Sequence, residues 1–355
     1  MISVNIKHPT VTLAIPTYNE SLTVENVIKK FLATEYSNLI EIFVADGGST
    51  DDTQMIVHNL SLVEPRVKLI HNPLKIQAAG KNLILQESTG EIFIIADAHS
   101  DYAPDYIEKC VEVLLKSEAL NVGGAQRFVA KTPFQVSVAL ASKSFLGSGG
   151  AKYRDPDYNG YADTVYLGCF WRKTLLDVSG FDISQFTNED AELNQKLLQK
   201  SQKAIYISSE IGVWYYPRKT WKSICIQYFK YGRGRYLTTV KHKSNFQLRG
   251  KLPFLVISST GLILLIDIIF PQLGLPIRKI ILFSLFFPLL ESLRIKLKFR
   301  KKLKSEVWRG NEQDYPSNIY LWLFCAVILL TMPFAHFSGY TYQIIRSRVL
   351  RISKW

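Results

Sequence analysis

The sequence predicts an α/β fold, a mixed and mainly parallel sheet flanked by helices, followed by a C-terminal α-helical membrane region. Two observations lead to this prediction. In the first third of the chain, short runs of β-branched and aromatic residues alternate four times with segments of helical periodicity, the pattern of a doubly wound sheet. In the last third, long apolar stretches are separated by basic residues, which is typical of membrane helices.

Each expected strand in the first third is an apolar run that stops at a polar or glycine-rich turn. These strands are Val11–Ile15, Glu41–Ala45, Val67–Ile70 and residues 91–96. A helix is expected after each strand, and Ser21 and Pro104 mark two helix starts, because serine caps helices and proline is tolerated in the first turn. Ligand loops should lie at the carboxyl ends of such strands.

Two further segments complete the first 240 residues. Residues 204–214 alternate in polarity and predict two short strands, and residues 221–236 predict a basic, aromatic helix. In that helix Trp221, Ile224 and Tyr228 share a face, while Lys222 and Lys230 add charge. The pattern indicates either a helix lying in a membrane interface or a groove for phosphates.

The distribution of charge indicates the kind of partner. The chain has 355 residues and a net charge of +13, with no Asp or Glu but ten Lys or Arg residues between positions 211 and 266. Such a block binds phosphates, either of nucleic acid or of anionic lipids. Because long apolar stretches follow directly, we expect a lipid bilayer as the partner and no nucleic acid.

Three mainly apolar stretches follow the basic block, at about 252–275, 277–290 and 318–338. The first is long enough to cross a bilayer, whereas the second is short enough to be a re-entrant or interfacial helix. We therefore expect a domain over residues 1–245, whose residues 219–245 form a basic interfacial region. Residues 246–355 should form a membrane-embedded region with two or three spans.

The positive-inside bias predicts the orientation of these spans. The basic block before residue 251 and the basic loop Arg294–Arg309 should both face the cytoplasm. If 318–338 also spans, the basic tail lies on the opposite side, against the bias. Either Pro333, His336 and Gly339 break the last stretch into a re-entrant segment, or the bias is overruled.

The four cysteines indicate no disulfide framework or metal site, and the N-terminus indicates no signal peptide. Cys110, Cys169, Cys225 and Cys325 have neither a paired nor a metal-binding spacing, so reduced thiols are expected. Residues 1–9 lack the apolar run of a signal peptide.

The strand at 91–96 ends in groups that can bind a cation. Asp97 and His99 are two residues apart, so their side chains leave on the same side if the extended conformation persists. A carboxylate with an imidazole suits Mn²⁺ or Mg²⁺ better than a closed zinc site. The alternative is a solvated loop after a core strand, and Asp101 is an alternative ligand.

Four motifs resemble, in order and spacing, those of family 2 glycosyltransferases with the GT-A fold. The motifs are Pro16-Thr17-Tyr18-Asn19-Glu20, Asp46-Gly47-Gly48-Ser49-Thr50-Asp51-Asp52-Thr53, Asp97-Ala98-His99 and Asn188-Glu189-Asp190. The resemblance covers roughly residues 10–240. Finer motifs are similar to the bacterial succinoglycan-type branch, which builds exopolysaccharide on a lipid carrier: Gly149–Arg154, Asp163–Val165 and Gln227–Gly232.

This resemblance implies roles for the nucleotide donor. Pro16, Tyr18, Glu20 and Asp46 match positions around the base and ribose, with Asp46 suited to accept a hydrogen bond from a uracil imide. Gly47 and Gly48 allow the close backbone approach that such a loop needs. Lys81 either contacts a phosphate or is a solvated helix lysine.

The resemblance also implies the metal ligands and the base. Asp97 would contact ribose or metal, and His99 would ligate metal where most family members have Asp. Because neutral imidazole adds no negative charge, we expect weaker metal binding that falls further in acid. Asp190 matches the general base, and Glu189 is the competing assignment, since acids in a first helical turn have a structural explanation. The segment 146–169 is either an acceptor-side lid or a plain surface loop.

These expectations describe a metal-dependent, inverting hexosyltransferase anchored in the inner cell membrane by several spans, with a cytoplasmic catalytic domain. Its donor would be a UDP-sugar, its acceptor a polyprenyl-phosphate-linked saccharide, and other polysaccharide assembly proteins are candidate partners. Residues 227–231 are not the Gln-x-x-Arg-Trp signature of processive members, so single addition is expected. The alternative is a catalytically silent nucleotide-sugar-binding scaffold. A nucleotidyltransferase is disfavoured because no glycine-rich basic loop follows the first strand.

Overall fold

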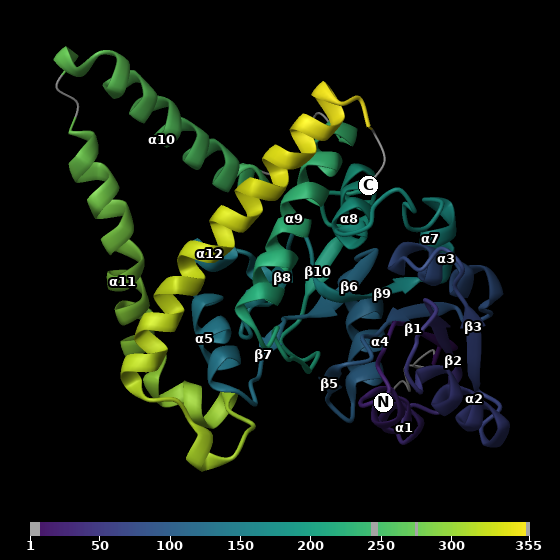
Figure 1. The fold of residues 1–355 in the computed structure, drawn as a ribbon. Coiled ribbons are helices and arrows are strands. Elements are labelled where there is room, and N and C mark those ends of the chain that lie inside the picture. The colour runs from purple at the N-terminus through teal and green to yellow at the C-terminus, as the bar shows by residue number, and fades with distance from the viewer. Residues whose placement is uncertain (1–7, 243–247, 274–275, 353–355) are drawn as a thin grey trace. The chain divides into compact units, whose positions relative to one another are not determined.

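The computed structural model describes residues 8–242, 248–273 and 276–352 (Figure 1). They form two compact units. The first unit comprises the chain up to Arg127 together with Asp155–Tyr215, and the second comprises Phe128–Arg154 together with the chain from Tyr216 onwards. The helix at residues 221–241 therefore groups by packing with the C-terminal helices. The predicted boundary at 245 separates a cytoplasmic domain from a membrane-embedded region, and it stays a prediction.

The first unit is built on an eight-stranded mixed sheet with the order β3-β2-β1-β4-β9-β6-β10-β8. Its strands are β1 (Val11–Thr17), β2 (Leu39–Asp46), β3 (Val67–His71), β4 (Ile92–Ile95), β6 (Asn121–Gly124), β8 (Gly160–Tyr161), β9 (Tyr166–Trp171) and β10 (Ile205–Ile207). β1, β2, β3 and β4 pair in parallel, whereas β9 is antiparallel to both β4 and β6. The predicted α/β fold with a mixed, mainly parallel sheet is confirmed.

Helices and a small second sheet complete this unit. The helices are α1 (Val24–Leu32), α2 (Thr53–Val63), α3 (Gln77–Glu87), α4 (Tyr106–Ser117), α7 (Arg172–Asp177) and α8 (Glu189–Lys200). The small sheet has the order β5-β11-β7, formed by β5 (Ser100–Tyr102), β11 (Val213–Tyr215) and β7 (Arg127–Phe128). The predicted cap at Ser21 is wrong, because α1 starts two residues later, with Thr23 at its N-cap position.

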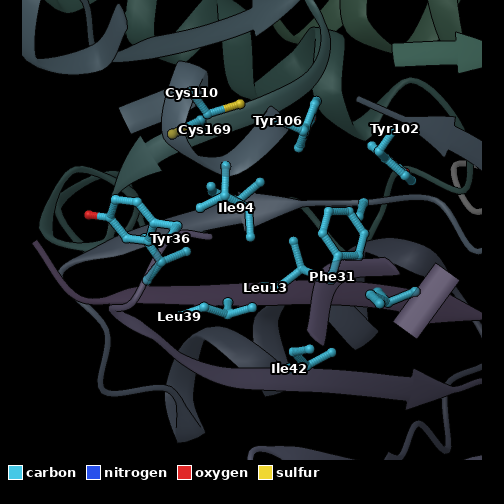
Figure 2. Close-up of a cluster of buried hydrophobic side chains, with 14 of the residues drawn as sticks. Leu13, Phe31, Tyr36, Leu39, Ile42, Ile94, Tyr102, Tyr106, Cys110 and Cys169 are labelled. Carbon is cyan, nitrogen blue, oxygen red and sulfur yellow. The ribbon is translucent and has the colours of Figure 1, made fainter. Parts of the chain in front are cut away.

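The core of the first unit lies between the sheet and its helices (Figure 2). Leu13, Ile42 and Ile94 come from adjacent strands, and each is fully buried. Figure 2 shows the side chains of Cys110 and Cys169 beside this cluster; both are free thiols. Burial and the neighbouring Cys110 thiol raise the pKa of Cys169, so it is an unreactive packing residue.

The second unit is helical. Its helices are α5 (Pro133–Ala141), α6 (Phe145–Ser148), α9 (Trp221–Lys241), α10 (Leu252–Ile269), α11 (Ile277–Lys302) and α12 (Asn318–Ile344). α12 packs against α9, α11, α5 and α10 and is therefore the central element. The indole of Trp322 donates a 2.8 Å hydrogen bond to the carbonyl of Leu289 on α11, and the ring of Phe254 on α10 lies 4.7 Å from that of Tyr340.

Two helices among the described residues are long and apolar enough to cross a membrane, Leu252–Ile269 and Asn318–Val349. No residue of α10 is fully buried, and although Phe254 packs on α12, apolar side chains such as Leu262 and Ile268 stay exposed, at 58% and 75%. The expected stretch 277–290 is the first half of α11, which continues as a basic helix to Lys302. Of the two alternatives for the last stretch, a break at Pro333, His336 and Gly339 is wrong, because α12 runs through all three without interruption.

Two glycines allow the backbones of α9 and α12 to come into direct contact. A Cβ atom added at Gly232 would lie 2.0 Å from the carbonyl oxygen of His336, and one at Gly339 would lie 1.9 Å from that of Phe229. Real Cβ atoms cannot approach so closely, so any side chain at either position separates the two helices. Gly261 on α10 is different, since an added Cβ would have no neighbour within 4 Å.

We predict that Gly339→Ala destabilises the protein by at least about 2 kcal/mol, because the added methyl group forces the helix backbones apart. Thermal unfolding of the detergent-solubilised chain measures this as a lower midpoint. Gly261→Ala is the matched control, and its midpoint should stay unchanged or rise, since alanine favours a helix over glycine by about 1 kcal/mol. Equal midpoints for both variants would contradict the prediction.

Candidate active site

Asp97 is held by a tyrosine from β9. β9 pairs antiparallel with β4, with Ile94 opposite Cys169, and Tyr166 is the first residue of β9. The Tyr166 hydroxyl donates a 2.7 Å hydrogen bond to Oδ2 of Asp97. Burial and the adjacent Asp97 carboxylate raise the pKa of Tyr166 well above its usual value, so the phenol remains a proton donor at neutral pH.

A second tyrosine fixes the backbone at the same position. The Asp97 amide donates to the Tyr102 hydroxyl at 2.6 Å, and that hydroxyl donates to the Asp97 carbonyl at 3.0 Å. The Ser100 hydroxyl lies 2.8 Å from that of Tyr166. The carboxylate of Asp97 is therefore positioned by a connected set of hydroxyl groups at the carboxyl end of β4.

His99 is directed differently from the sequence-based expectation. β4 ends at Ile95 and residues 98–99 form a turn, so Asp97 and His99 do not leave the same face of one strand. Nδ1 of His99 lies 2.9 Å from Oε1 of Glu20, which follows β1. This contact fixes the ring and makes Nε2 the nitrogen that would ligate a metal, an arrangement common among metal-binding histidines.

The loops after β1 and β2 are joined by hydrogen bonds. Asn19, in a left-handed conformation with φ of 56°, accepts from the Thr50 amide at 2.8 Å through Oδ1. The Glu20 amide donates to the Thr53 hydroxyl at 2.8 Å. The two motifs of the predicted donor site thus form one rigid rim. Tyr18 stands on this rim with 57% of its surface exposed, and Pro16 is buried within β1.

Asp46 stabilises the turn after β2, which forms part of this rim. It is buried at the end of β2, and its Oδ2 accepts hydrogen bonds of 2.9 Å from the amides of Gly48 and Ser49. The Ser49 hydroxyl bonds to its other oxygen. Gly48 has φ of 81°, which agrees with the predicted need for glycine here. A contact from Asp46 to uracil stays a prediction, since both oxygens already hold the turn.

A buried ion pair joins α3 to α8. Nζ of Lys81 lies 2.8 Å from Oε1 of Glu189, and the two side chains are 7% and 8% exposed. Burial lowers the pKa of Lys81, whereas Glu189 raises it, and the net shift is upward. The carboxylates of Asp190 and Asp97 act in the same direction, so three carboxylates lie within electrostatic reach of one ammonium group. A contact from Lys81 to a phosphate stays a prediction.

Glu189 and Asp190 are neighbours with different surroundings. Glu189 is buried against Lys81, whereas Asp190 is exposed at the start of α8. Oδ1 of Asp190 accepts a 2.7 Å hydrogen bond from the Ala191 amide. Of the two carboxylates, Asp190 is therefore the one that solvent or a substrate hydroxyl can reach.

Asp97 and His99 supply a carboxylate and an imidazole, ligand types that Mn²⁺ accepts. Within residues 8–242, 248–273 and 276–352, no group of three or more His, Cys, Asp or Glu side chains is arranged to hold an ion. Mn²⁺ or Mg²⁺ with one carboxylate, one imidazole and substrate phosphates needs no such group. Asp101 pairs with Lys30 on α1 at 2.7 Å, which favours His99 as the second ligand.

Comparisons with known proteins agree with this geometry. Residues 12–171 match the model of glycosyl transferase family 2. The succinoglycan biosynthesis protein ExoA of Rhizobium meliloti is 35% identical over 246 residues, which cover 69% of this chain and 74% of ExoA. The chain belongs to glycosyl transferase family 2. The transferase is thus of the exopolysaccharide type and takes its sugar from a nucleotide donor.

Two more distant proteins extend the comparison. The GalNAc(5)-diNAcBac-PP-undecaprenol beta-1,3-glucosyltransferase of Campylobacter jejuni is 24% identical over 211 residues, covering 58% of the transferase and 64% of that relative. The mannosyltransferase PcManGT from Pyrobaculum calidifontis, solved with GDP-Man and Mn²⁺, has a TM-score of 0.56 and 17% identity, covering 92% of the transferase and 88% of that chain. This second likeness shows a shared GT-A fold.

Sequence reasoning missed the residues that position the site. Tyr166, Tyr102 and Asn82 were not among the expected site residues. Asn82 bonds the backbone of Phe181 twice, at 2.7 and 2.8 Å, and thereby holds the turn that precedes α8. The available signal was the run 164–167, which reads as a strand, but its partner strand could not be inferred without the antiparallel register.

We predict that Tyr166→Phe weakens Mn²⁺ binding in the presence of UDP by about 10- to 100-fold, because the carboxylate it positions loses a hydrogen bond. Electron paramagnetic resonance of bound Mn²⁺ measures this without turnover. Tyr161→Phe is the control, since that hydroxyl donates to the Ser117 carbonyl instead. A similar loss in both variants, or none in Tyr166→Phe, would refute a positioning role.

Proposed function

We propose that this transferase is a membrane-attached, metal-dependent, inverting enzyme that moves a hexose from a UDP-sugar to a polyprenyl-phosphate-linked saccharide. The observation that supports the proposal is the buried ion pair of Lys81 and Glu189, together with the upward effect of the Asp190 and Asp97 carboxylates on the pKa of the same lysine. In this proposal the donor-binding and acceptor-activating groups come from distant parts of the chain.

Asp190 is the proposed general base. Asp190 is exposed, whereas Glu189 forms a buried ion pair with Lys81. We therefore assign the proton transfer to Asp190 and a structural role to Glu189. Asp190 would take the proton of the acceptor hydroxyl as that oxygen attacks the anomeric carbon opposite the diphosphate. Attack from that face inverts the configuration of the sugar. General base assistance of this kind is typically worth about 10² to 10⁴ in rate.

Asp97 and His99 are the proposed ligands of Mn²⁺ or Mg²⁺. A bound divalent cation neutralises the charge that develops on the departing diphosphate. Tyr166 would keep the Asp97 carboxylate in place, and Glu20 would keep the His99 ring in one tautomer and orientation.

The rim formed by the loops after β1 and β2 is the proposed nucleotide site. Tyr18 and Pro16 would lie along the base, with Asp46 and Glu20 behind them. We favour a uracil base because Asp46 matches the family position that suits its imide, a contact for which the carboxylate would have to give up a bond to the turn at Gly48 and Ser49. Since the solved structure of PcManGT contains GDP-Man, the donor test includes GDP-sugars.

A lipid-linked acceptor and an inner-membrane location are proposed on two grounds. The Campylobacter relative is named for an undecaprenol-linked substrate. In addition, α10 exposes apolar side chains such as Leu262 and Ile268, which suits a helix in a bilayer. The cytoplasmic orientation and the number of spans remain parts of this proposal, as do partners among other polysaccharide assembly proteins.

One observation favours a second function, a silent nucleotide-sugar-binding scaffold. The usual acidic third residue of the metal motif is His99 here, so the protein supplies little negative charge to the cation. Such a scaffold would bind donor without transferring its sugar.

We predict that Asp190→Asn lowers kcat by about 10² to 10⁴ while leaving the thermal midpoint and donor binding unchanged. Transfer from radiolabelled UDP- and GDP-sugars to lipid-linked saccharides, with Mn²⁺ present, measures this. Asp177→Asn, at an exposed carboxylate at the end of α7, is the control and should retain full activity. Donor binding without transfer by the wild type, across the acceptors tried, would favour the scaffold.

We also predict that chelation with EDTA abolishes transfer and that added Mn²⁺ restores it, because the diphosphate otherwise departs without charge compensation. His99→Ala should raise the Mn²⁺ concentration needed for half-maximal activity at least tenfold. Asp101→Ala should not, since Asp101 pairs with Lys30. A larger effect at position 101 than at 99 would reverse the ligand assignment.

A further inference from the structure

The helices α9 and α12 of the second unit lie side by side (Figure 1). Side chains of both helices line a groove. The indole of Trp221 donates to the Thr331 hydroxyl at 2.9 Å at one end of the contact, and Arg233 contacts Gln343 further along. The groove has a volume of about 700 Å³. Its wall is mainly apolar, formed by Trp221, Ile226, Phe229, Val327, Leu330 and Phe334.

One end of the groove is basic. Lys230 and Arg233 line it, and Nε of Arg233 donates to Oε1 of Gln343 at 2.9 Å. The guanidinium of Arg233 lies 5.1 Å from the centre of the Tyr342 ring, and Arg346 contacts the hydroxyl of the same ring at 3.4 Å. The guanidinium groups of Arg233 and Arg346 thus both contact Tyr342. Lys230 lies about one helical turn from Arg233 on α9.

The two helices that form the walls contain no acidic residue. Residues 211–266, which include all of α9, contain no Asp or Glu, and neither do residues 315–355, which include all of α12. Burial lowers the pKa of Arg233, Tyr342 opposes this, and the nearby Arg346 lowers it further, with a net downward shift. An anion bound at this end would relieve that repulsion.

We propose that this groove binds the polyprenyl diphosphate part of the lipid-linked acceptor, an inference that rests on the proposed function. The isoprenoid chain would lie along the apolar wall, with the diphosphate at Lys230 and Arg233. Three neighbouring cations match the two to three negative charges of a diphosphate better than the single charge of a common anionic phospholipid. Charge-assisted hydrogen bonds to phosphate are among the stronger polar contacts in proteins.

The position of the groove on α9 also suits the acceptor. On another face of the same helix, the Tyr228 hydroxyl donates to the Gly147 carbonyl at 3.4 Å. Gly147 belongs to the segment 146–169 that was predicted as an acceptor-side lid, and this segment continues along the chain to Tyr166. One helix therefore contacts both the proposed carrier groove and the start of the proposed lid.

The test measures binding of undecaprenyl diphosphate to the full-length chain in lipid nanodiscs, without donor or sugar transfer. We expect Lys230→Gln and Arg233→Gln each to weaken binding about tenfold. Lys222→Gln is the matched control, because Lys222 lies on α9 outside the groove. Ala335→Phe, which places a ring against the apolar wall, should weaken binding of the lipid but not of inorganic pyrophosphate.

Several outcomes would overturn the proposal. Equal competition by phosphatidylglycerol would make the groove a general lipid site, and equal binding by inorganic pyrophosphate would remove the role of the apolar wall. An unchanged affinity in Lys230→Gln, a substitution at an exposed side chain, would remove the charge argument. Because the assay needs no turnover, binding can be established even if transfer fails. An unchanged KM for the lipid acceptor in both groove variants would reject the groove and leave the transferase assignment intact.

Discussion

The arrangement of the active site depends on the buried ion pair between Lys81 and Glu189. Its partners lie 108 residues apart in sequence, and neither side chain is more than 8% exposed. Removing one partner of such a pair leaves an uncompensated buried charge, which is strongly destabilising. The pair therefore locks the start of α8 against α3, and the next residue, Asp190, is presented to solvent in a fixed position. Asn82, adjacent to Lys81, bonds the turn before α8, so a single stretch of α3 determines where the proposed base stands.

The other side of the site is determined by strand pairing. β9 is the antiparallel strand next to the parallel half of the sheet, and its register with β4 brings the Tyr166 hydroxyl to Asp97. The loops after β1 and β2 are held together by backbone and side-chain hydrogen bonds, with Asp46 supporting the turn at Gly48. Both halves of the site therefore rest on contacts that need no ligand, so the donor meets a preorganised surface.

The strands and helices of the first unit could be predicted because their signals are local. An apolar run such as Ile92–Ile95 predicts a buried strand without reference to distant residues. The contacts that build the site are not local: the ion pair, the Tyr166 bond and the His99–Glu20 contact each join residues at least 66 positions apart. The expectation that Asp97 and His99 leave one strand on the same side is wrong, because the strand ends at Ile95 and a turn at 98–99 redirects the imidazole. The expected break at Pro333 failed because packing along α12 outweighs the single backbone hydrogen bond that proline removes.

The glycine contact between α9 and α12 has a consequence for biosynthesis on the ribosome. The two helices meet through residues 110 positions apart, such as Arg233 and Gln343, and α10 and α11 are encoded between them. At a translation rate of about 5 to 20 residues per second, α12 emerges roughly 5 to 20 s after α9. During that interval the face of α9 that carries Gly232 has no helix to pack against, although α10 and α11 have already been synthesised. Chaperone or insertase occupancy of α9 in nascent chains should therefore end only when α12 has left the exit tunnel.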